Sequence, residues 1–132
     1  MKITGLDGKV HNWIYAGNTS EEESNKSNLH IRARKLLKTM FPLDRIMEEV
    51  HLPGSFGLRL DFFLPTRVMA IEVHGEQHYK YNSFFYSSKM EFVKAKKRDV
   101  NKIEWCRIND IRIAELPYNE GEEQWMNRIY QC

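Results

Sequence analysis

Four side chains that could take part in chemistry lie close together in residues 58 to 79, LRLDFFLPTRVMAIEVHGEQHY. They are Asp61, Glu72, His74 and His78, and most of their neighbours are large apolar residues. Charged groups are rarely buried without a partner, so acids and imidazoles in this setting indicate a bound metal or a reacting group. Two carboxylates suit Mg²⁺ or Mn²⁺, and the histidines could transfer protons near neutral pH.

The stretch reads as two strands joined by a turn, and the alternation of side chains along a strand predicts which residues meet. A turn centred on Pro65–Thr66 pairs Phe63 with Val68, which makes Asp61 and Glu72 diagonal neighbours on one face. His74 shares that face. The opposite face is then the predicted core, formed by Leu60, Phe62, Leu64, Met69, Ile71 and Val73.

Two other interpretations of the same residues stay open. Asp61 and Glu72 could pair with Arg59 and Arg67 on a solvated sheet face. Alternatively, His74, His78 and His30 could form a zinc site, although no CxxC or HExxH spacing accompanies them.

The elements that must position these residues follow from turn, cap and periodicity signals. Asp7–Gly8 predicts an N-terminal β-hairpin over residues 1–18, followed by a polar linker over 19–26. Ser27 is a good N-cap for a helix that ends before Pro42. Strands are predicted at 45–52, within 58–74 and at 111–116, and helices at 87–108 and 122–130, with Met90, Val93, Val100 and Ile103 as the core stripe of the longer helix.

This order predicts one α/β domain over residues 1–132, with a mixed sheet flanked by helices and residues 27–132 as the catalytic core. The 132 residues, of which 42% are hydrophobic, suit one core. No apolar run approaches the ~20 residues that cross a bilayer. MKITGLDGKV lacks the apolar core of a signal peptide, so we expect a cytoplasmic protein of a bacterium or a phage-infected cell, with Cys106 and Cys132 reduced.

The net charge of +2 hides an uneven distribution of basic residues. Eight Lys and Arg residues lie between positions 80 and 107, and a second group comprises Arg32, Arg34, Lys35 and Lys38. Such segregation suits a polyanion, while solvated helix faces are the alternative. The predicted DNA contacts are Arg32, Lys89, Lys94, Lys96, Lys97 and Arg98.

Asp61 on one strand, followed by Glu72-Val73-His74 on the next, resembles the motif of the PD-(D/E)XK nuclease superfamily, with His74 in the place of lysine. RLDFFLPTRVMAIEVHGEQHY looks like the corresponding segment of very-short-patch repair endonucleases, and it resembles EDxHD homing endonucleases and small phage-borne nucleases. The resemblance covers roughly residues 27 to 118.

The resemblance implies a restriction-endonuclease-like fold and Mg²⁺-dependent phosphodiester hydrolysis. It makes Asp61 the metal-bridging carboxylate and Glu72 the second acid, with the Val73 carbonyl nearby. His74 takes the proton-handling position and His78 assists it. His30 stands where the family has a glutamate on the first helix. Asp99 matches the final aspartate, and a pair with Lys102, three residues later on the same helix, is the alternative role for it. The zinc cysteines of the repair enzymes are absent from this sequence.

We therefore expect a metal-dependent DNA endonuclease that nicks or cuts, either structure-selective or guided by a protein partner, as a monomer or homodimer. A site-specific homing endonuclease of the EDxHD type is the alternative enzyme. A nuclease fold retained as an inactive DNA-binding module is the alternative from another class.

Overall fold

The computed structural model describes residues 1–14, 18–19 and 27–132. Within them the chain is a mixed α/β domain with an N-terminal antiparallel strand pair, as predicted. The strands are β1 (Lys2–Thr4), β2 (Val10–Asn12), β3 (Asn18–Thr19), β4 (Met47–His51), β5 (Arg59–Leu64), β6 (Met69–His74) and β7 (Arg112–Pro117). The helices are α1 (Asn28–Met40), the 3-10 turn η1 (Glu76–His78), α2 (Lys89–Ile108) and α3 (Glu122–Gln131).

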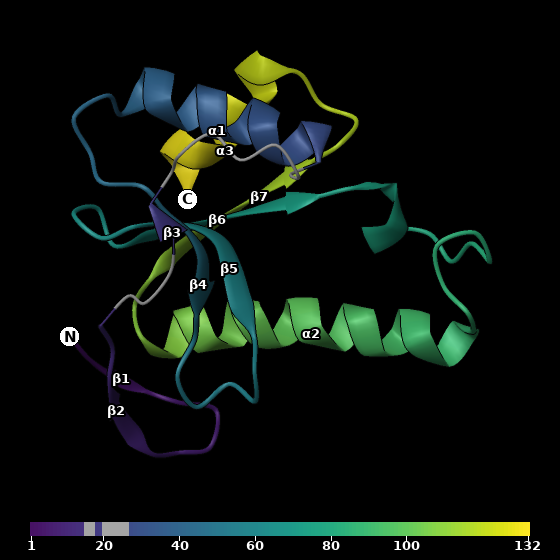
Figure 1. Ribbon diagram of the computed structural model, residues 1–132, viewed down its shortest axis with the longest axis horizontal. Helices are drawn as coiled ribbons and strands as arrows, with labels where there is room; N and C mark the ends of the chain where they lie inside the picture. Colours follow the sequence, from purple (N-terminus) through teal and green to yellow (C-terminus); the bar gives the residue numbers. More distant parts are fainter. Residues whose placement is uncertain (15–17, 20–26) are drawn as a thin grey trace.

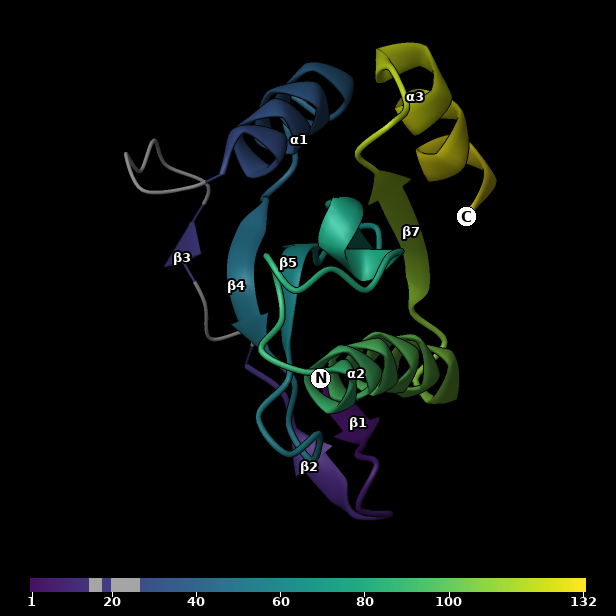
Figure 2. The ribbon, with the colours of Figure 1, turned by 90° about the vertical axis from the view of Figure 1, so that its right-hand side faces the viewer.

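The main sheet has the strand order β3-β4-β5-β6-β7, and it is antiparallel except for the parallel pair β6–β7. A parallel pair needs a long crossover, and α2 provides it between β6 and β7. Figures 1 and 2 show α1 and α3 on one face of the sheet, with α2 and the β1–β2 pair on the other. Among the described residues, no helix combines the length and apolar character needed to cross a membrane.

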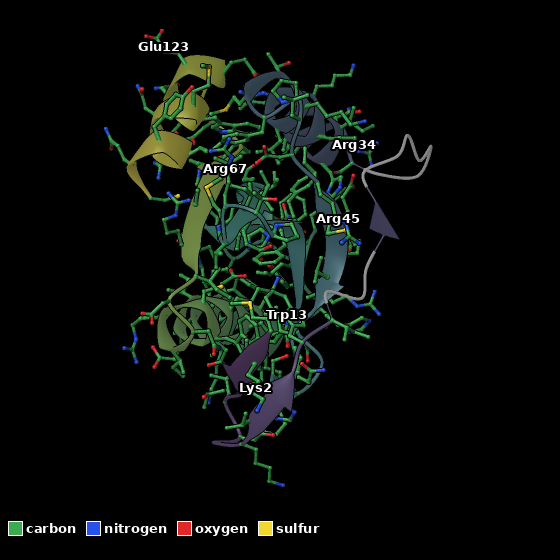
Figure 3. All side chains as sticks on the ribbon, turned by 90° about the vertical axis from the view of Figure 1, so that its left-hand side faces the viewer. Lys2, Trp13, Arg34, Arg45, Arg67 and Glu123 are labelled. Carbon is green, nitrogen blue, oxygen red and sulfur yellow. The ribbon has the colours of Figure 1, made fainter. Side chains whose placement is uncertain are left out.

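The N-terminal hairpin forms where Asp7–Gly8 predicts it, with Ile3 opposite His11 and Gly8 at a φ of +76°. Trp13 fastens it to the domain, since its indole nitrogen donates to the His51 carbonyl at 2.9 Å and its ring meets Trp105 edge-on (Figure 3). The predicted limits were wrong at one point: Asn18–Thr19 forms β3 and pairs with β4 instead of ending the hairpin and starting a linker. Residues 15–17 and 20–26 lie outside the described part.

Helix α1 begins at the predicted cap, because the Ser27 hydroxyl accepts a hydrogen bond from the His30 amide at 3.1 Å. Ala33 and Leu37 of this helix are buried. Arg34 does not belong to an exposed basic group, because it is buried and donates two 2.9 Å hydrogen bonds to Glu48 of β4 (Figure 3).

Both faces of the sheet are apolar cores, whereas the sequence pattern predicted one core face and one polar face. Phe62, Ile71 and Trp125 belong to the core beneath α1 and α3. Leu60, Phe63 and Trp105 belong to the core beneath α2 and the hairpin. A central strand covered on both sides reads as a continuous apolar run, as Met69-Ala70-Ile71 does. Alternation of apolar and polar residues therefore cannot show which face of the sheet each side chain occupies.

The predicted core stripe of α2 is also wrong. Met90, Val93, Val100 and Ile103 are exposed, with 37% to 62% of each residue's surface accessible. Trp105 and Cys106 are the buried residues of this helix. The first turns of α2 extend past the end of the sheet, so only the later turns pack against it (Figure 1).

The buried Arg34–Glu48 pair gives a test of how α1 is held. Arg34→Ala leaves the Glu48 carboxylate, on a residue only 2% exposed, without its bidentate partner, and we expect a loss of about 3–5 kcal/mol in the free energy of unfolding. Urea denaturation measures this loss. The control is Lys35→Ala, an exposed neighbour on α1, which should stay within about 0.5 kcal/mol of wild type. Equal effects of the two substitutions would contradict this account.

Candidate active site

The site begins where β5 and β6 separate. Their ladder pairs Leu64 with Met69 and Phe62 with Ile71, and the next position brings Asp61 opposite Glu72. At this position the backbone amides donate to side-chain carboxylates instead of to backbone carbonyls. The Asp61 amide donates to Glu72 Oε2 at 2.6 Å, and the Val73 amide donates to Asp61 Oδ2 at 2.8 Å. Beyond this point β5 stays paired with β4, and β6 stays paired with β7.

The predicted register is therefore wrong by two residues, because the connection runs over four residues, Pro65 to Val68, instead of two. The two acids are direct partners across the fork between β5 and β6. A register error of two residues preserves the face of every side chain, so it changes the cross-strand partners but not which residues share a face.

A second irregularity does change which residues meet. Glu49 has a φ of 54°, and Glu48 and Glu49 both approach α1. Asp61 and Phe62 are successive residues of β5, and both lie near His30 of α1. Both side chains therefore face α1, as those of Glu48 and Glu49 do. Asp61 consequently lies toward α1, whereas Glu72 bonds Lys102 of α2. The prediction that Asp61, Glu72 and His74 share one face is wrong.

On the α1 side, His30, Glu49 and Asp61 each offer one ligand atom, and these atoms lie within 4.8 Å of one another. Asp61 and His30 line a pocket of about 240 Å³ together with Ser27, Leu29, Val73, Gly75 and Gln77. His30 is also hydrogen-bonded to the buried Glu48, which fixes its ring beside Phe62. Two carboxylates and one imidazole at a pocket form a donor set that fits Mn²⁺ or Mg²⁺.

On the α2 side, the Glu72 carboxylate forms an ion pair of 2.7 Å with Lys102. Burial, followed by the charge of Asp61, raises the pKa of Glu72 to about 8 even though Lys102 opposes the shift. Burial alone would lower the pKa of Lys102, and Glu72 more than offsets it, so that pKa is raised. The alternative pairing of Glu72 with Arg67 does not form, because Arg67 pairs with Asp44.

His74, His78 and Asp99 form a second cluster on this side, again with ligand atoms within 4.8 Å of one another. The imidazole rings stack with centroids 4.3 Å apart, and His78 Nδ1 lies 3.0 Å from Asp99 Oδ2. Burial and then the charge of His78 lower the pKa of His74 to about 4. Burial favours a raised pKa for Asp99, but the hydrogen bond and charge of His78 outweigh it and lower that pKa.

The predicted site residues fall into two separate clusters. His30 lies with Asp61, so the zinc interpretation that combined it with His74 and His78 is wrong. Glu49 and Lys102 are members of the site that the sequence reasoning missed. Two adjacent acids, Glu48 and Glu49, within a predicted strand could have indicated Glu49 as a site residue. Lys102 could have been indicated by its spacing of three residues from Asp99 on a predicted helix.

The proposed phosphate-binding residues also occupy two places. Lys89, Lys94, Lys97 and Arg98 are exposed on α2, while the Lys96 ammonium lies 5.2 Å from the Tyr79 ring centroid. Arg32 is on α1, where it pairs with Glu122 and its guanidinium lies 3.7 Å above the Trp125 ring. Arg32 therefore ties α1 to α3, and the basic surface next to the site comes from α2.

Comparisons with known proteins give relatives without a described function. The chain is 34% identical over 65 residues to "Uncharacterized protein 307L" of Invertebrate iridescent virus 6, which is 49% of this chain and 33% of that protein. It is 36% identical over 62 residues to "Uncharacterized protein 033L" of Invertebrate iridescent virus 3, covering 47% of this chain and 32% of that protein. The matches span about a third of these relatives. No family model matches the chain, and no solved structure gives a significant match.

The buried imidazole of His74 predicts a specific pH dependence in metal-free protein. Its lowered pKa means that the unfolded chain binds the proton more tightly, so this contribution to stability is complete above about pH 6.5 and is lost as the pH falls toward 4. We expect wild type to lose about 2 kcal/mol more than His74→Gln over this interval in EDTA. Urea denaturation at several pH values measures it, with His51→Gln, on an exposed residue, as control. Parallel curves for wild type and His74→Gln would contradict it.

Proposed function

We propose that the chain is a metal-dependent endonuclease that hydrolyses phosphodiester bonds in DNA. One observation carries the proposal: a carboxylate cluster at a pocket and a hydrogen-bonded histidine–aspartate pair lie on the two sides of the fork between β5 and β6. Metal-assisted hydrolysis of a phosphodiester needs these two components, which are ligands for a hard cation and a group that transfers protons. The resemblance to PD-(D/E)XK nucleases agrees with this assignment.

In this proposal Asp61 and Glu49 hold Mg²⁺ or Mn²⁺, with the Val73 carbonyl and His30 as further ligands. The bound ion would neutralise charge on the phosphodiester and make a coordinated water more acidic. Glu49 then supplies the acid that the sequence assigned to Glu72. Glu72 instead holds Lys102 at the fork, and Lys102 stands in for the lysine whose place His74 occupies in the sequence motif.

The His78–Asp99 pair supplies the proton transfer. Asp99 Oδ2 lies at His78 Nδ1, which leaves Nε2 to take a proton from water or give one to the leaving oxygen. The low pKa of Asp99 keeps its carboxylate ionised, so it stabilises the imidazolium that forms during transfer. His74 stacks on His78 and fixes the orientation of its ring.

The exposed basic residues of α2 position the substrate. Lys89, Lys94, Lys97 and Arg98 lie on the same helix as Asp99 and Lys102, so phosphates held on this surface are close to the site. Phosphate contacts fix the register of DNA without reading its sequence. We therefore propose a structure-selective or partner-guided enzyme, acting as a monomer or homodimer, over a site-specific homing endonuclease.

Nicking of supercoiled plasmid with Mg²⁺, Mn²⁺ or EDTA tests the function. Wild type should nick with either metal and not in EDTA. Asp61→Asn and His78→Gln should each lower the rate about 10²-fold or more, because one removes a metal ligand and the other a proton carrier. Asp110→Asn and His51→Gln, both on exposed residues, are matched controls and should keep wild-type rates. Nicking that survives EDTA, or that both Asp61→Asn and His78→Gln retain, would refute the assignment.

A further inference from the structure

A second cluster of potential metal ligands lies on the α2 side of the sheet and has no metal role in the proposed hydrolysis. His74 ends β6, His78 ends the η1 turn, and Asp99 lies in the middle of α2. One ligand atom from each lies within 4.8 Å of the other two. We propose that these three residues bind a zinc-type transition-metal ion, and that Glu115 of β7 positions His74 for it.

The arrangement around His74 supports this ligand set. His74 Nδ1 lies 3.2 Å from Glu115 Oε2, which leaves Nε2 as the ligand atom. Ligating histidines almost always donate their other nitrogen to a carboxylate or carbonyl, which fixes the tautomer and ring orientation. Glu115 therefore lies where an outer partner of a metal-bound histidine would lie, on the strand next to His74 in the sheet.

The spacing of the ligand atoms also fits such an ion. Zinc binds imidazole and carboxylate ligands at about 2.0–2.2 Å, so tetrahedral ligand atoms lie about 3.4 Å apart. The 3.0 Å contact between His78 and Asp99 is close to this spacing, and the ligand atom of His74 lies within 4.8 Å of both. Three protein ligands leave a fourth position for water.

Charge around the cluster favours a cation. Asp99 and Glu115 both face the two imidazoles. The charges of Lys102 and Lys96 also reach His74, but Lys102 pairs with Glu72 at 2.7 Å, and Lys96 lies over the rings of Tyr79 and Phe92. Asp99 and Glu115 make their close side-chain contacts with the imidazoles, so both carboxylates can face a bound ion.

The two clusters differ in ligand type, so they should select different ions. The cluster on the α1 side has two carboxylates and one imidazole, whereas this one has two imidazoles and one carboxylate. Imidazole suits zinc-type ions, and carboxylate suits magnesium and manganese. Resting on the proposed function, zinc on the second cluster would occupy His78 and stop proton transfer while the hydrolytic metal stays bound. Zinc is then an inhibitor that acts at its own site.

The experiment titrates the metal-free full chain with Co²⁺, a spectroscopic stand-in, and displaces it with Zn²⁺. Wild type should show visible absorption bands typical of low-coordinate cobalt, and Zn²⁺ should abolish them. His74→Gln and His78→Gln should remove the bands. Glu115→Gln, which changes a half-exposed residue and should leave folding intact, should weaken Co²⁺ affinity about 10- to 100-fold. Asp61→Asn should bind as wild type does.

Absence of displaceable Co²⁺ from wild type, or its retention in both histidine variants, would refute the site. The inhibitory role is tested separately by adding Zn²⁺ to plasmid nicking in excess Mg²⁺, with each variant scored against its own rate. Glu115→Gln should need about tenfold more Zn²⁺ for half inhibition, and an unchanged requirement would refute the inhibitory role. Cobalt binding without any nicking would refute the proposed nuclease activity but support the second metal site. Nicking without cobalt binding would support the nuclease activity but refute the second metal site.

Discussion

The whole arrangement depends on two carboxylates that occupy the gap where β5 and β6 separate. Asp61 accepts a hydrogen bond from the Val73 amide, and Glu72 accepts one from the Asp61 amide, so side chains satisfy backbone groups that the ladder no longer pairs. A buried amide without an acceptor is costly, and this requirement fixes both acids in place. Glu72 in turn fixes Lys102, which holds α2 against the sheet. The fork, the helix that covers it and the residues around it are therefore held by one connected set of hydrogen bonds.

The fork also brings groups with divergent pKa values together on the α2 side of the sheet. Burial raises the pKa of Glu72 and lowers that of His74, while the hydrogen bond with His78 keeps the pKa of Asp99 low. Divergent pKa values of neighbouring groups allow one site to hold a neutral base and an anion at the same pH. The chain reaches this state by sending Asp61 toward α1 and Glu72 toward α2, which keeps a cation-binding cluster apart from a proton-transferring one.

Much of the framework could be predicted from the sequence, because local signals agree with the fold. The Asp7–Gly8 hairpin, the Ser27 cap and the strand order around Pro65 each depend on a few neighbouring residues. The single-face site could not be predicted, because strand alternation assumes regular backbone and Glu49 has a φ of 54°. The meeting of His78 with Asp99 was reachable only through the family resemblance, since 21 residues separate them. Glu115 gave no signal, because its partner His74 lies on a parallel strand brought alongside by α2.

Helix α2 shows why hydrophobic periodicity failed at the site itself. The inward positions of its later turns include Asp99, Lys102, Trp105 and Cys106. Two of these four positions carry charges that bind His78 and Glu72, so the face that packs against the sheet is only partly apolar. The apolar residues that repeat with helical spacing, Met90, Val93 and Val100, were left on the outside. Because α2 uses two positions of its inner face for Asp99 and Lys102, fewer apolar residues lie on that face. The hydrophobic periodicity of the sequence therefore indicates the exposed face of α2 as the buried one.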